Sequence, residues 1–265
     1  MNTTLMAMLS LRDALLRGKR RPRRFGAGSP TMYRGDGYEF IELRGYVPGD
    51  DVRRIDWAAT ARAGELQTRV VLEDVALTLA VMVDDTRSMQ VGRSRRLLDA
   101  AQEAAHAWFG AARSGDRLLR IGSDYLGPAH APVTTPFESL GALATARRAL
   151  RRGTALLAIG DWYDLTTQNT DLLESLAAWC DCTALIARDP WYDGLPLGGI
   201  VRFAGAEGGR LRTYIGRRER ESFALAVRAR EDELVARFSQ AGWRTGILHE
   251  ADGAASLRAA FGVAQ

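Results

Sequence analysis

The sequence has very little lysine, cysteine and histidine. Lys19 is the single lysine among 36 basic residues, and Arg20 follows it. The chain therefore has no G-K-[ST] phosphate-binding loop, and only Lys19 is left for Schiff-base chemistry. Two cysteines, Cys180 and Cys182, are too few for a disulfide framework, and core thiols are the favoured interpretation. The three histidines are far apart and give a zinc cluster little support (His106, His130 and His249).

Long apolar runs are also missing. The longest, Val75–Val83, has nine residues even when Thr78 is counted, whereas a membrane-spanning helix needs about 20. The apolar start at Leu5–Leu11 precedes a basic run instead of following one, which is the wrong order for a secretory signal. We therefore expect no membrane span and a cytoplasmic location. With 46% hydrophobic residues, the chain can still bury one substantial core, with or without a small extra module.

Charge is unevenly distributed along the chain. The formal net charge is +4, but residues 1–24 hold seven basic groups and one acid, so residues 25–265 sum to −2. The sequence thus has a basic leader on a mildly acidic body. Residues 12–24 could bind nucleic acid or anionic lipid through phosphate contacts, or they could form a solvated tail. Both alternatives stay open.

Patterning divides the chain into three regions, which are a basic helical leader (1–24), a small antiparallel β module (25–74) and an α/β domain (75–265). In the leader, residues 3–17 have helical spacing, and Gly18 is expected to end the helix. In the β module, strands are expected at Tyr38–Tyr46 and Leu66–Leu72. A Pro-Gly turn within Val47–Asp51 follows the first of them.

From residue 75 onwards, predicted strands alternate with helices. The strands are Val75–Val83, Arg117–Gly122, Thr154–Gly160, Cys182–Ala187 and Arg244–His249. The helices are Arg93–Arg113, Pro136–Arg152, Asp171–Trp179, Glu219–Ala241 and Ala254–Phe261. A hairpin of Gly199–Ala204 and Arg210–Ile215 is inserted near 199–215. This alternation predicts a doubly wound, mostly parallel α/β sheet.

Aspartates follow three of the predicted strands, at Asp84, Asp124 and Asp161. In open α/β sheets, ligands bind at the carboxyl ends of strands, near the point where the strand order reverses. The first of these ends reads D-x-T-x-S, so Thr86 and Ser88 add hydroxyl oxygens to Asp84. Oxygen ligands of this kind suit a hard divalent cation such as Mg²⁺.

This strand end resembles the metal-ion-dependent adhesion site of von Willebrand factor A domains, whose first strand ends D-x-S-x-S. The resemblance implies a site for Mg²⁺, or for Mn²⁺ or Ca²⁺, made of Asp84, Thr86, Ser88 and Asp161, with Thr134 or Thr135 as the further threonine. Arg87 stands where a glycine is usual, and Gly160 stands where a serine commonly precedes the later aspartate. The alternative is a site without metal, in which Asp84 and Asp161 cap turns and helices.

A longer motif resembles the domain of unknown function 58 family. It comprises Gly37–Phe40, Leu43–Trp57 and Ala58–Arg62, and Asp189-Pro190 matches a later element of that family. The resemblance covers about residues 25–262 and implies a von Willebrand A-like domain after the motif. It also implies partnership with a MoxR-type AAA+ ATPase. The chain would then be a non-enzymatic adaptor or co-chaperone that binds no nucleotide itself.

The motif contains several charged residues that can form charge-assisted pairs, with Trp57 as an anchor on the sheet. The segment is either a structural clasp or a partner-binding surface made of Asp50, Asp51, Arg53, Arg54, Asp56 and Trp57. Trp162-Tyr163 and Trp191-Tyr192 also follow predicted strands. They form either an aromatic rim around the metal position or ordinary cover for the sheet edge.

The sequence is also compatible with two other functions. One is a Mg²⁺-dependent hydrolase in which Asp84 and Asp161 hold the metal that activates water. The other is binding to an anionic surface or nucleic acid through the basic leader. Neither His106 nor His249 has a serine or cysteine nucleophile motif nearby, so nucleophilic catalysis has little support.

Overall fold

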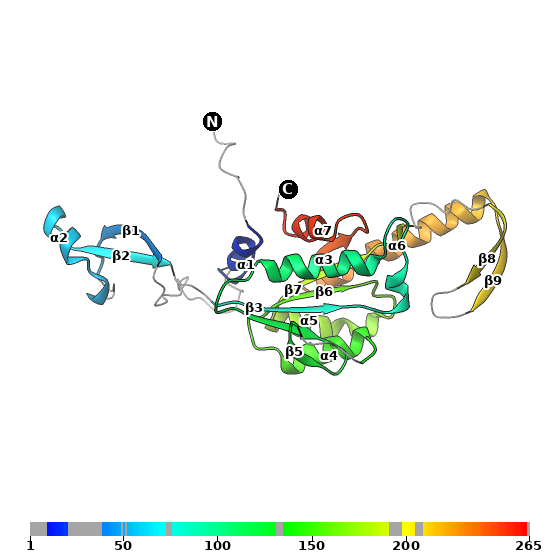
Figure 1. Ribbon diagram of the computed structural model, residues 1–265, viewed down its shortest axis with the longest axis horizontal. Coiled ribbons are helices and arrows are strands. Elements are labelled where there is room, and N and C mark those ends of the chain that lie inside the picture. Colours follow the sequence, from blue (N-terminus) through cyan, green and yellow to red (C-terminus); the bar gives the residue numbers. More distant parts are fainter. Residues whose placement is uncertain are drawn as a thin grey trace, which may run out of the picture. The chain divides into compact units, whose positions relative to one another are not determined.

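The computed structural model describes residues 10–20, 39–48, 50, 52–72, 76–130, 135–190, 198–204 and 209–263. These residues fall into two compact units. One unit contains helix α1 (Leu11–Arg20) and every element from strand β3 to the last helix, α7 (Figure 1). The other contains strands β1 and β2 with the short helices between them.

The larger unit is built on a six-stranded, mostly parallel sheet with the order β10-β7-β6-β3-β4-β5. Its strands are β3 (Thr78–Val83), β4 (Arg117–Ile121), β5 (Leu126–Pro128), β6 (Ala155–Gly160), β7 (Asp181–Ala187) and β10 (Arg244–Leu248). Only β5 is antiparallel to its neighbour. The strand order reverses between β3 and β6, since β4 and β5 lie on one side of β3 and the later strands lie on the other. The predicted α/β sheet is thereby confirmed, whereas β5 was not predicted because three residues show no periodicity.

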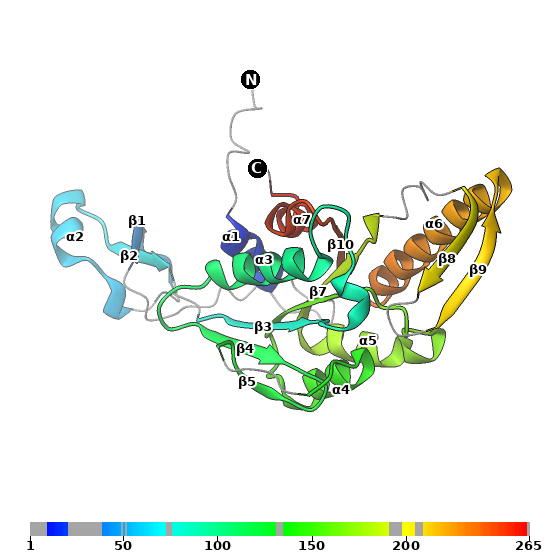
Figure 2. The ribbon, with the colours of Figure 1, turned by 45° about the vertical axis from the view of Figure 1, so that its right-hand side comes forward.

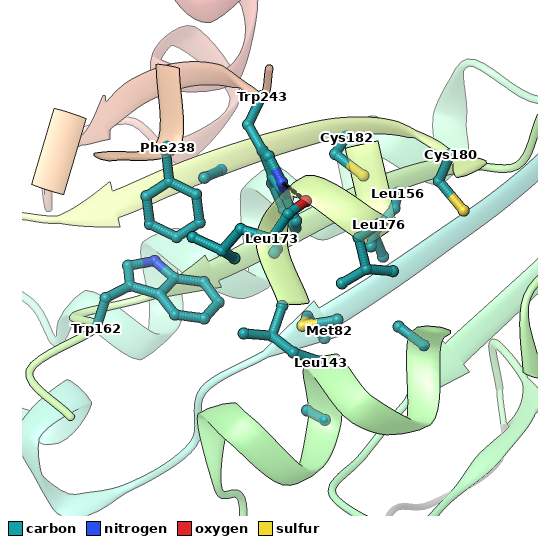
Figure 3. Packing of buried hydrophobic residues seen from close by; sticks show 14 of the residues in the cluster. Met82, Leu143, Leu156, Trp162, Leu173, Leu176, Cys180, Cys182, Phe238 and Trp243 are labelled. Carbon is teal, nitrogen blue, oxygen red and sulfur yellow. Dashed lines mark hydrogen bonds between the residues drawn. The ribbon is translucent and has the colours of Figure 1, made fainter. Parts of the chain in front are cut away.

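Helices cover both faces of this sheet. Alternate residues of β3 enter two separate cores, with Met82 in one and Val81 in the other. The first core is completed by α4 (Ser139–Ala149), α5 (Thr170–Trp179) and α6 (Arg217–Gln240), and Figure 3 shows its aromatic centre. The second core is completed by α1, α3 (Leu97–Gly110) and α7 (Gly253–Ala260). The thiols of Cys180 and Cys182 are buried in the first core, as expected.

The smaller unit pairs β1 (Glu39–Gly45) with β2 (Gln67–Leu72) in antiparallel fashion, which confirms the predicted β module. A hydrogen bond of 3.0 Å from Asp50 N to Val47 O closes the expected turn. Helix α2 (Trp57–Ala63) follows η1 (Val52–Arg54) and was not predicted. Local signals nonetheless define it, because the Asp56 carboxylate accepts a hydrogen bond from Ala59 N and Gly64 ends the helix at φ +73°.

The expectation that Gly18 ends the leader helix was wrong, because α1 runs from Leu11 to Arg20. A glycine inside a helix costs only about 1 kcal/mol, and the tertiary contacts of this helix offset such a cost. Leu15 is buried in the second core, and Arg12 forms an ion pair with Asp116. Residues 1–9 and 21–38 lie outside the described part of the chain.

The hairpin of β8 (Gly199–Ala204) and β9 (Arg210–Ile215) has the predicted bounds and forms a separate two-stranded sheet. Short 3-10 segments complete the larger unit, namely η2 (Arg87–Gln90) and η3 (Thr167–Asn169). Within the described ranges, every helix is too short or too polar to span a bilayer.

Candidate metal centre

Asp84 and Asp161 lie side by side where the strand order of the main sheet reverses. Asp84 directly follows β3, and Asp161 directly follows the neighbouring strand β6. Val83 and Ile159 are paired in the parallel ladder, and Asp84 N donates a hydrogen bond of 2.8 Å to Ile159 O. The two carboxylates therefore occupy the position at which open α/β sheets bind ligands.

Two hydroxyl groups connect the two carboxylates. The Asp84 Oδ1 atom accepts hydrogen bonds from Thr86 Oγ1 at 2.6 Å and from Thr86 N at 2.9 Å. Thr86 Oγ1 and Ser88 Oγ are 2.8 Å apart, and the Ser88 hydroxyl lies near enough to the Asp161 carboxylate to lower its pKa. Four oxygen-bearing side chains predicted from the D-x-T-x-S pattern and the later aspartate thus form one connected cluster. We call these four residues the strand-end cluster.

Burial makes the negative charge of this cluster costly. Asp84 exposes 2% of its surface. Burial raises its pKa above the ordinary value, the hydrogen bonds from Thr86 oppose that rise, and the nearby charge of Asp161 adds to it. Burial also raises the pKa of Asp161, against the hydrogen bond from Ser88. The cluster is therefore a place where added positive charge would be favourable.

Gly160 allows the two strand ends to approach this closely. A Cβ atom at this position would lie 3.1 Å from the Cβ of Asp84 and 3.3 Å from its Oδ2. Both distances are tighter than ordinary van der Waals contact, so a larger residue would displace the Asp84 carboxylate. Glycine at this position therefore avoids a shift of a few tenths of an ångström in the Asp84 side chain.

The loop after Asp161 is held in an unusual backbone conformation. Trp162 has φ 57°, a left-handed conformation that is costly for a bulky residue. Its ring is buried and packs edge-on against Phe238 of α6, at 5.3 Å between ring centroids (Figure 3). Arg230 of α6 donates to the carbonyl oxygens of Trp162, Tyr163 and Leu165 at 3.2, 3.3 and 3.0 Å.

This geometry corrects the expectation that Trp162 belongs to an exposed aromatic rim or a partner-binding surface. Because residue 162 is left-handed, its side chain turns into the core, where a partner cannot reach it. Tyr163 is exposed beside the cluster and remains available for contact. Trp191 and Tyr192 lie outside the described residues.

The third strand end forms its own hydrogen bond. Thr135 Oγ1 donates to Asp124 Oδ1 at 2.7 Å, after β4. Thr134 lies outside the described residues, so which threonine would belong to a metal site stays a prediction. The role of Asp124 as a carboxylate at a strand end was anticipated, but its pairing with Thr135 was not.

The residues of the strand-end cluster fit a hard divalent cation. The donors are two carboxylates and two hydroxyls, all of them oxygen ligands. In the described ranges, no group of three or more His, Cys, Asp or Glu side chains could hold a metal ion, and the strand-end cluster itself contains two such residues together with two hydroxyls. Asp84, Thr86, Ser88 and Asp161 are therefore the residues that would hold such an ion.

A groove next to the cluster was not foreseen from the sequence. It has a volume of about 320 Å³ and is bordered by Asp161 and Tyr163, the end of β7 and the middle of α6. Its apolar lining comprises Ile186, Ala187, Phe223, Ala226, Val227 and Leu234. These residues come from three distant segments, so no local motif marks the groove.

Two aspartates of the Leu43–Trp57 motif form ion pairs within the smaller unit. Arg44 Nη2 donates to Asp50 Oδ1 at 2.8 Å, and Arg69 Nε donates to Asp56 Oδ2 at 2.8 Å. The hydrogen bond from Ala59 N and the one from Arg69 lower the pKa of Asp56. The two arginines lie on β1 and β2. These ion pairs attach the motif to both strands, as the structural-clasp alternative expects.

The remaining residues of that segment are placed as follows. Arg53 is exposed, and Trp57, at the start of α2, exposes 68% of its surface. Trp57 is thus not a core residue of the smaller unit. Asp51 and the side chain of Arg54 lie outside the described part of the chain. The partner-binding role of this surface stays a prediction.

Comparisons with other proteins identify the family. The profile described as "Protein of unknown function DUF58" matches residues 42–135. Uncharacterized protein Rv1480 of Mycobacterium tuberculosis and uncharacterized protein Mb1516 of Mycobacterium bovis are each 30% identical over 227 residues. Each alignment covers 76% of this chain and 71% of the relative. The chain belongs to the DUF58 family.

The region matched by the DUF58 profile contains residues 43–62 of the motif together with Asp84, Thr86 and Ser88. It ends before Asp161. Among solved structures, the type III effector protein XopQ complexed with adenosine diphosphate ribose is similar at 14% identity and a TM-score of 0.21. That comparison covers 66% of this chain and 58% of the other. So weak a similarity supports no conclusion about fold or ligand.

Proposed function

We propose that this DUF58 protein is a non-enzymatic protein-interaction module built on a von Willebrand A-like domain. Its binding edge is the strand-end cluster, which would hold a divalent cation with one open coordination position. The observation that carries this proposal is the convergence of Asp84, Thr86, Ser88 and Asp161 at the switch point between β3 and β6.

The electrostatics of the cluster support this assignment. Buried Asp84 and partly buried Asp161 are adjacent carboxylates with raised pKa values, and they gain most from a cation because it neutralises both. A bound Mg²⁺ or Mn²⁺ would supply a Lewis-acidic position able to accept a carboxylate oxygen from a partner protein. Exposed Tyr163 and the groove of about 320 Å³ beside Asp161 provide contact surface next to that position.

Within this proposal, the partner is a MoxR-type AAA+ ATPase, and this chain acts as its adaptor or co-chaperone. The sequence has no G-K-[ST] segment, so it cannot build the phosphate loop of such a motor. Energy from nucleotide hydrolysis would therefore come from the partner, while this chain selects or presents the client.

Isothermal titration calorimetry with Mg²⁺ and Mn²⁺ tests the metal site. The wild type should bind one ion, and Asp84→Ala should abolish the signal while far-ultraviolet circular dichroism stays unchanged. Asp85→Ala is the matched control, because Asp85 is the exposed neighbour of Asp84 in the same loop. Absence of binding by the wild type would remove the metal from the proposal.

A pull-down with the purified ATPase tests the adaptor role. Binding should fall with chelator and with Asp84→Ala or Asp161→Ala, and it should persist with Asp85→Ala. Equal recovery of the ATPase with and without chelator would show that any partnership does not use the strand-end cluster.

The same paired carboxylates favour a second candidate, a Mg²⁺-dependent hydrolase. Buried acids with raised pKa values are common in catalytic sites. Turnover of p-nitrophenyl phosphate or of a peptide panel with Mg²⁺, lost in Asp161→Ala, would support it. Inactivity on all of them, together with metal-dependent partner binding, would favour the interaction module.

A further inference from the structure

The β8–β9 hairpin is an element that the proposed function does not use. It pairs only with itself, apart from the six-stranded sheet. Figure 2 shows it alongside the amino-terminal half of α6, beyond the edge of the main sheet. The hairpin lies between β7 and α6 in the chain. The described strands of the main sheet are paired without it.

The register of the hairpin divides its residues between two faces. Ile200 is opposite Tyr214, Arg202 is opposite Arg212, and Ala204 is opposite Arg210. Directly opposed residues and their i+2 neighbours share a face. The outer face of the hairpin therefore consists of Ile200, Arg202, Arg210, Arg212 and Tyr214. On the other face, Ile215 is buried and Val201 and Thr213 are partly buried, whereas Leu211, nearer the loop, exposes 62% of its surface.

The outer face is both basic and apolar. Ile200 and Tyr214 expose 67% and 66% of their surfaces, and all three arginines are exposed. None of these arginines has an acidic partner within the described chain, and neither strand contains an acid. Arg202 directly opposite Arg212 is a like-charge pair, which destabilises a hairpin. Hairpin stability alone therefore does not account for this face.

We propose that the outer face of the hairpin docks an acidic protein segment that carries an apolar side chain among its carboxylates. Arginine forks pair bidentately with carboxylates, and the neighbouring Ile200–Tyr214 pair offers an apolar contact at the base of the hairpin. Tyrosine and arginine are also the residues that dominate protein–protein binding energy. This surface is separate from the strand-end cluster and needs no metal.

Charge distribution favours a protein over nucleic acid or lipid. Backbone contacts to a nucleic acid require an extended basic surface with many phosphate contacts. Here the basic face is short, with three arginines on two strands of six residues each. Two exposed apolar side chains at one end of the row of arginines suit a mixed acidic and apolar ligand better than a row of phosphates.

Fluorescence anisotropy on the full chain, with EDTA present throughout, tests this inference. The probe is a fluorescein-labelled peptide of alternating Glu and Leu, compared with a peptide in which Gln replaces Glu. The wild type should bind the Glu–Leu peptide, and binding should weaken with salt. Reversing Arg202, Arg210 and Arg212 to Glu should weaken binding about tenfold or more.

Two further variants distinguish binding at the outer face from a general effect of the protein's net charge. Reversal of the exposed arginines Arg62, Arg113 and Arg228 makes the same charge change elsewhere and should alter affinity by less than about twofold. Ile200→Ser combined with Tyr214→Ser should also weaken binding, because it removes both exposed apolar side chains of the face. Circular dichroism and thermal unfolding verify that each variant is folded.

Several outcomes would overturn the inference. They are no binding of the Glu–Leu peptide by the wild type, equal binding of the Gln–Leu peptide, and unchanged affinity in the Arg202/Arg210/Arg212 variant. Tighter binding of single-stranded DNA or of phosphatidylserine vesicles would assign the face to a different ligand class. Asp84→Ala should keep full affinity for the peptide, so failure of the metal site leaves this inference standing.

Discussion

Asp84 and Asp161 are carboxylates whose folded environment favours the protonated form. Each has an ordinary pKa of 3.8 when unperturbed, and burial raises the pKa of both in the folded protein. Between the ordinary and the raised value, the folded chain binds more protons than the unfolded chain. The free energy of unfolding therefore falls as pH rises through that window, and the penalty persists at neutral pH.

Asp161→Asn should relieve that penalty. In the presence of chelator, we expect a higher free energy of unfolding than wild type at pH 7, with the difference vanishing as pH approaches 3.8. The asparagine oxygen can still accept the 3.1 Å hydrogen bond from Tyr163 N. Urea denaturation at several pH values measures this, with Asp85→Asn as control. A variant less stable than wild type at pH 7 would contradict the prediction.

Thr86 has the central hydroxyl of the cluster, between Asp84 Oδ1 and Ser88 Oγ. Thr86→Val keeps the shape of the side chain but removes the hydroxyl. We expect affinity for Mg²⁺ or Mn²⁺ to fall about 10- to 100-fold. Thr86→Ser restores the hydroxyl and should stay close to wild type. Calorimetry on both variants decides the point, and equal losses in the two would show that the hydroxyl is not what matters.

At the scale of elements, α6 fixes the loop that carries Asp161. Arg230 binds three carbonyl oxygens of that loop, and Arg237 donates to Leu165 O at 3.2 Å. These bonds offset the cost of the left-handed backbone at Trp162. The position of one metal-site residue thus depends on a helix 68 residues further along the chain.

Arg230→Met should loosen this loop. It removes the donor from three carbonyl oxygens, and we expect a loss of about 1–3 kcal/mol in the free energy of unfolding, with weaker metal binding. Arg228→Met is the matched control, because Arg228 is an exposed arginine two residues earlier on the same helix. Its change should stay within about 0.5 kcal/mol. Chemical denaturation measures both, and equal effects would refute the role given to Arg230.

At the scale of the whole molecule, the basic leader is partly structural. Helix α1 belongs to the same compact unit as the main sheet, although the whole smaller unit, Pro22–Ala76, separates the two in sequence. The Arg12–Asp116 ion pair attaches it, with side-chain exposures of 8% and 1%. Asp116 also accepts hydrogen bonds from Leu77 N and Arg113 N. Binding of anionic partners through residues 12–24 stays a prediction, and residues 21–24 lie outside the described ranges.

Arg12→Met should destabilise the protein by about 3 kcal/mol at pH 7, because it leaves a buried carboxylate short of its cation. Burial opposes ionisation of Asp116, but hydrogen bonds from Arg12, Arg113 N and Leu77 N outweigh it and lower its pKa. The ion pair therefore stabilises the fold above pH 3.8, and this stabilisation is lost as pH falls through the lowered value. Urea denaturation of wild type and variant should converge in acid. Arg113→Met, which keeps the backbone donor, is the control.

Much of the fold followed from local pattern. Buried runs such as Thr154–Gly160 and the alternation along β8 and β9 depend on neighbouring residues only, so their bounds were predicted within a few positions. The three-residue strand β5 and the helix α2 were missed. Strand β5 is too short to show an alternating hydrophobic pattern. Helix α2 lies inside the family motif, whose residues were interpreted as a clasp or a binding surface and not as a helix.

The sequence by itself determined which side chains are available to the strand-end cluster, because D-x-T-x-S and the later aspartate each follow an apolar run. Only the tertiary structure decided that β3 and β6 are neighbours, which brings Asp84 to Asp161. It also decided that Trp162 points inward and that Arg230 holds its loop. Strand order and loop conformation depend on packing between residues far apart in the chain, and periodicity reports only on neighbours along it.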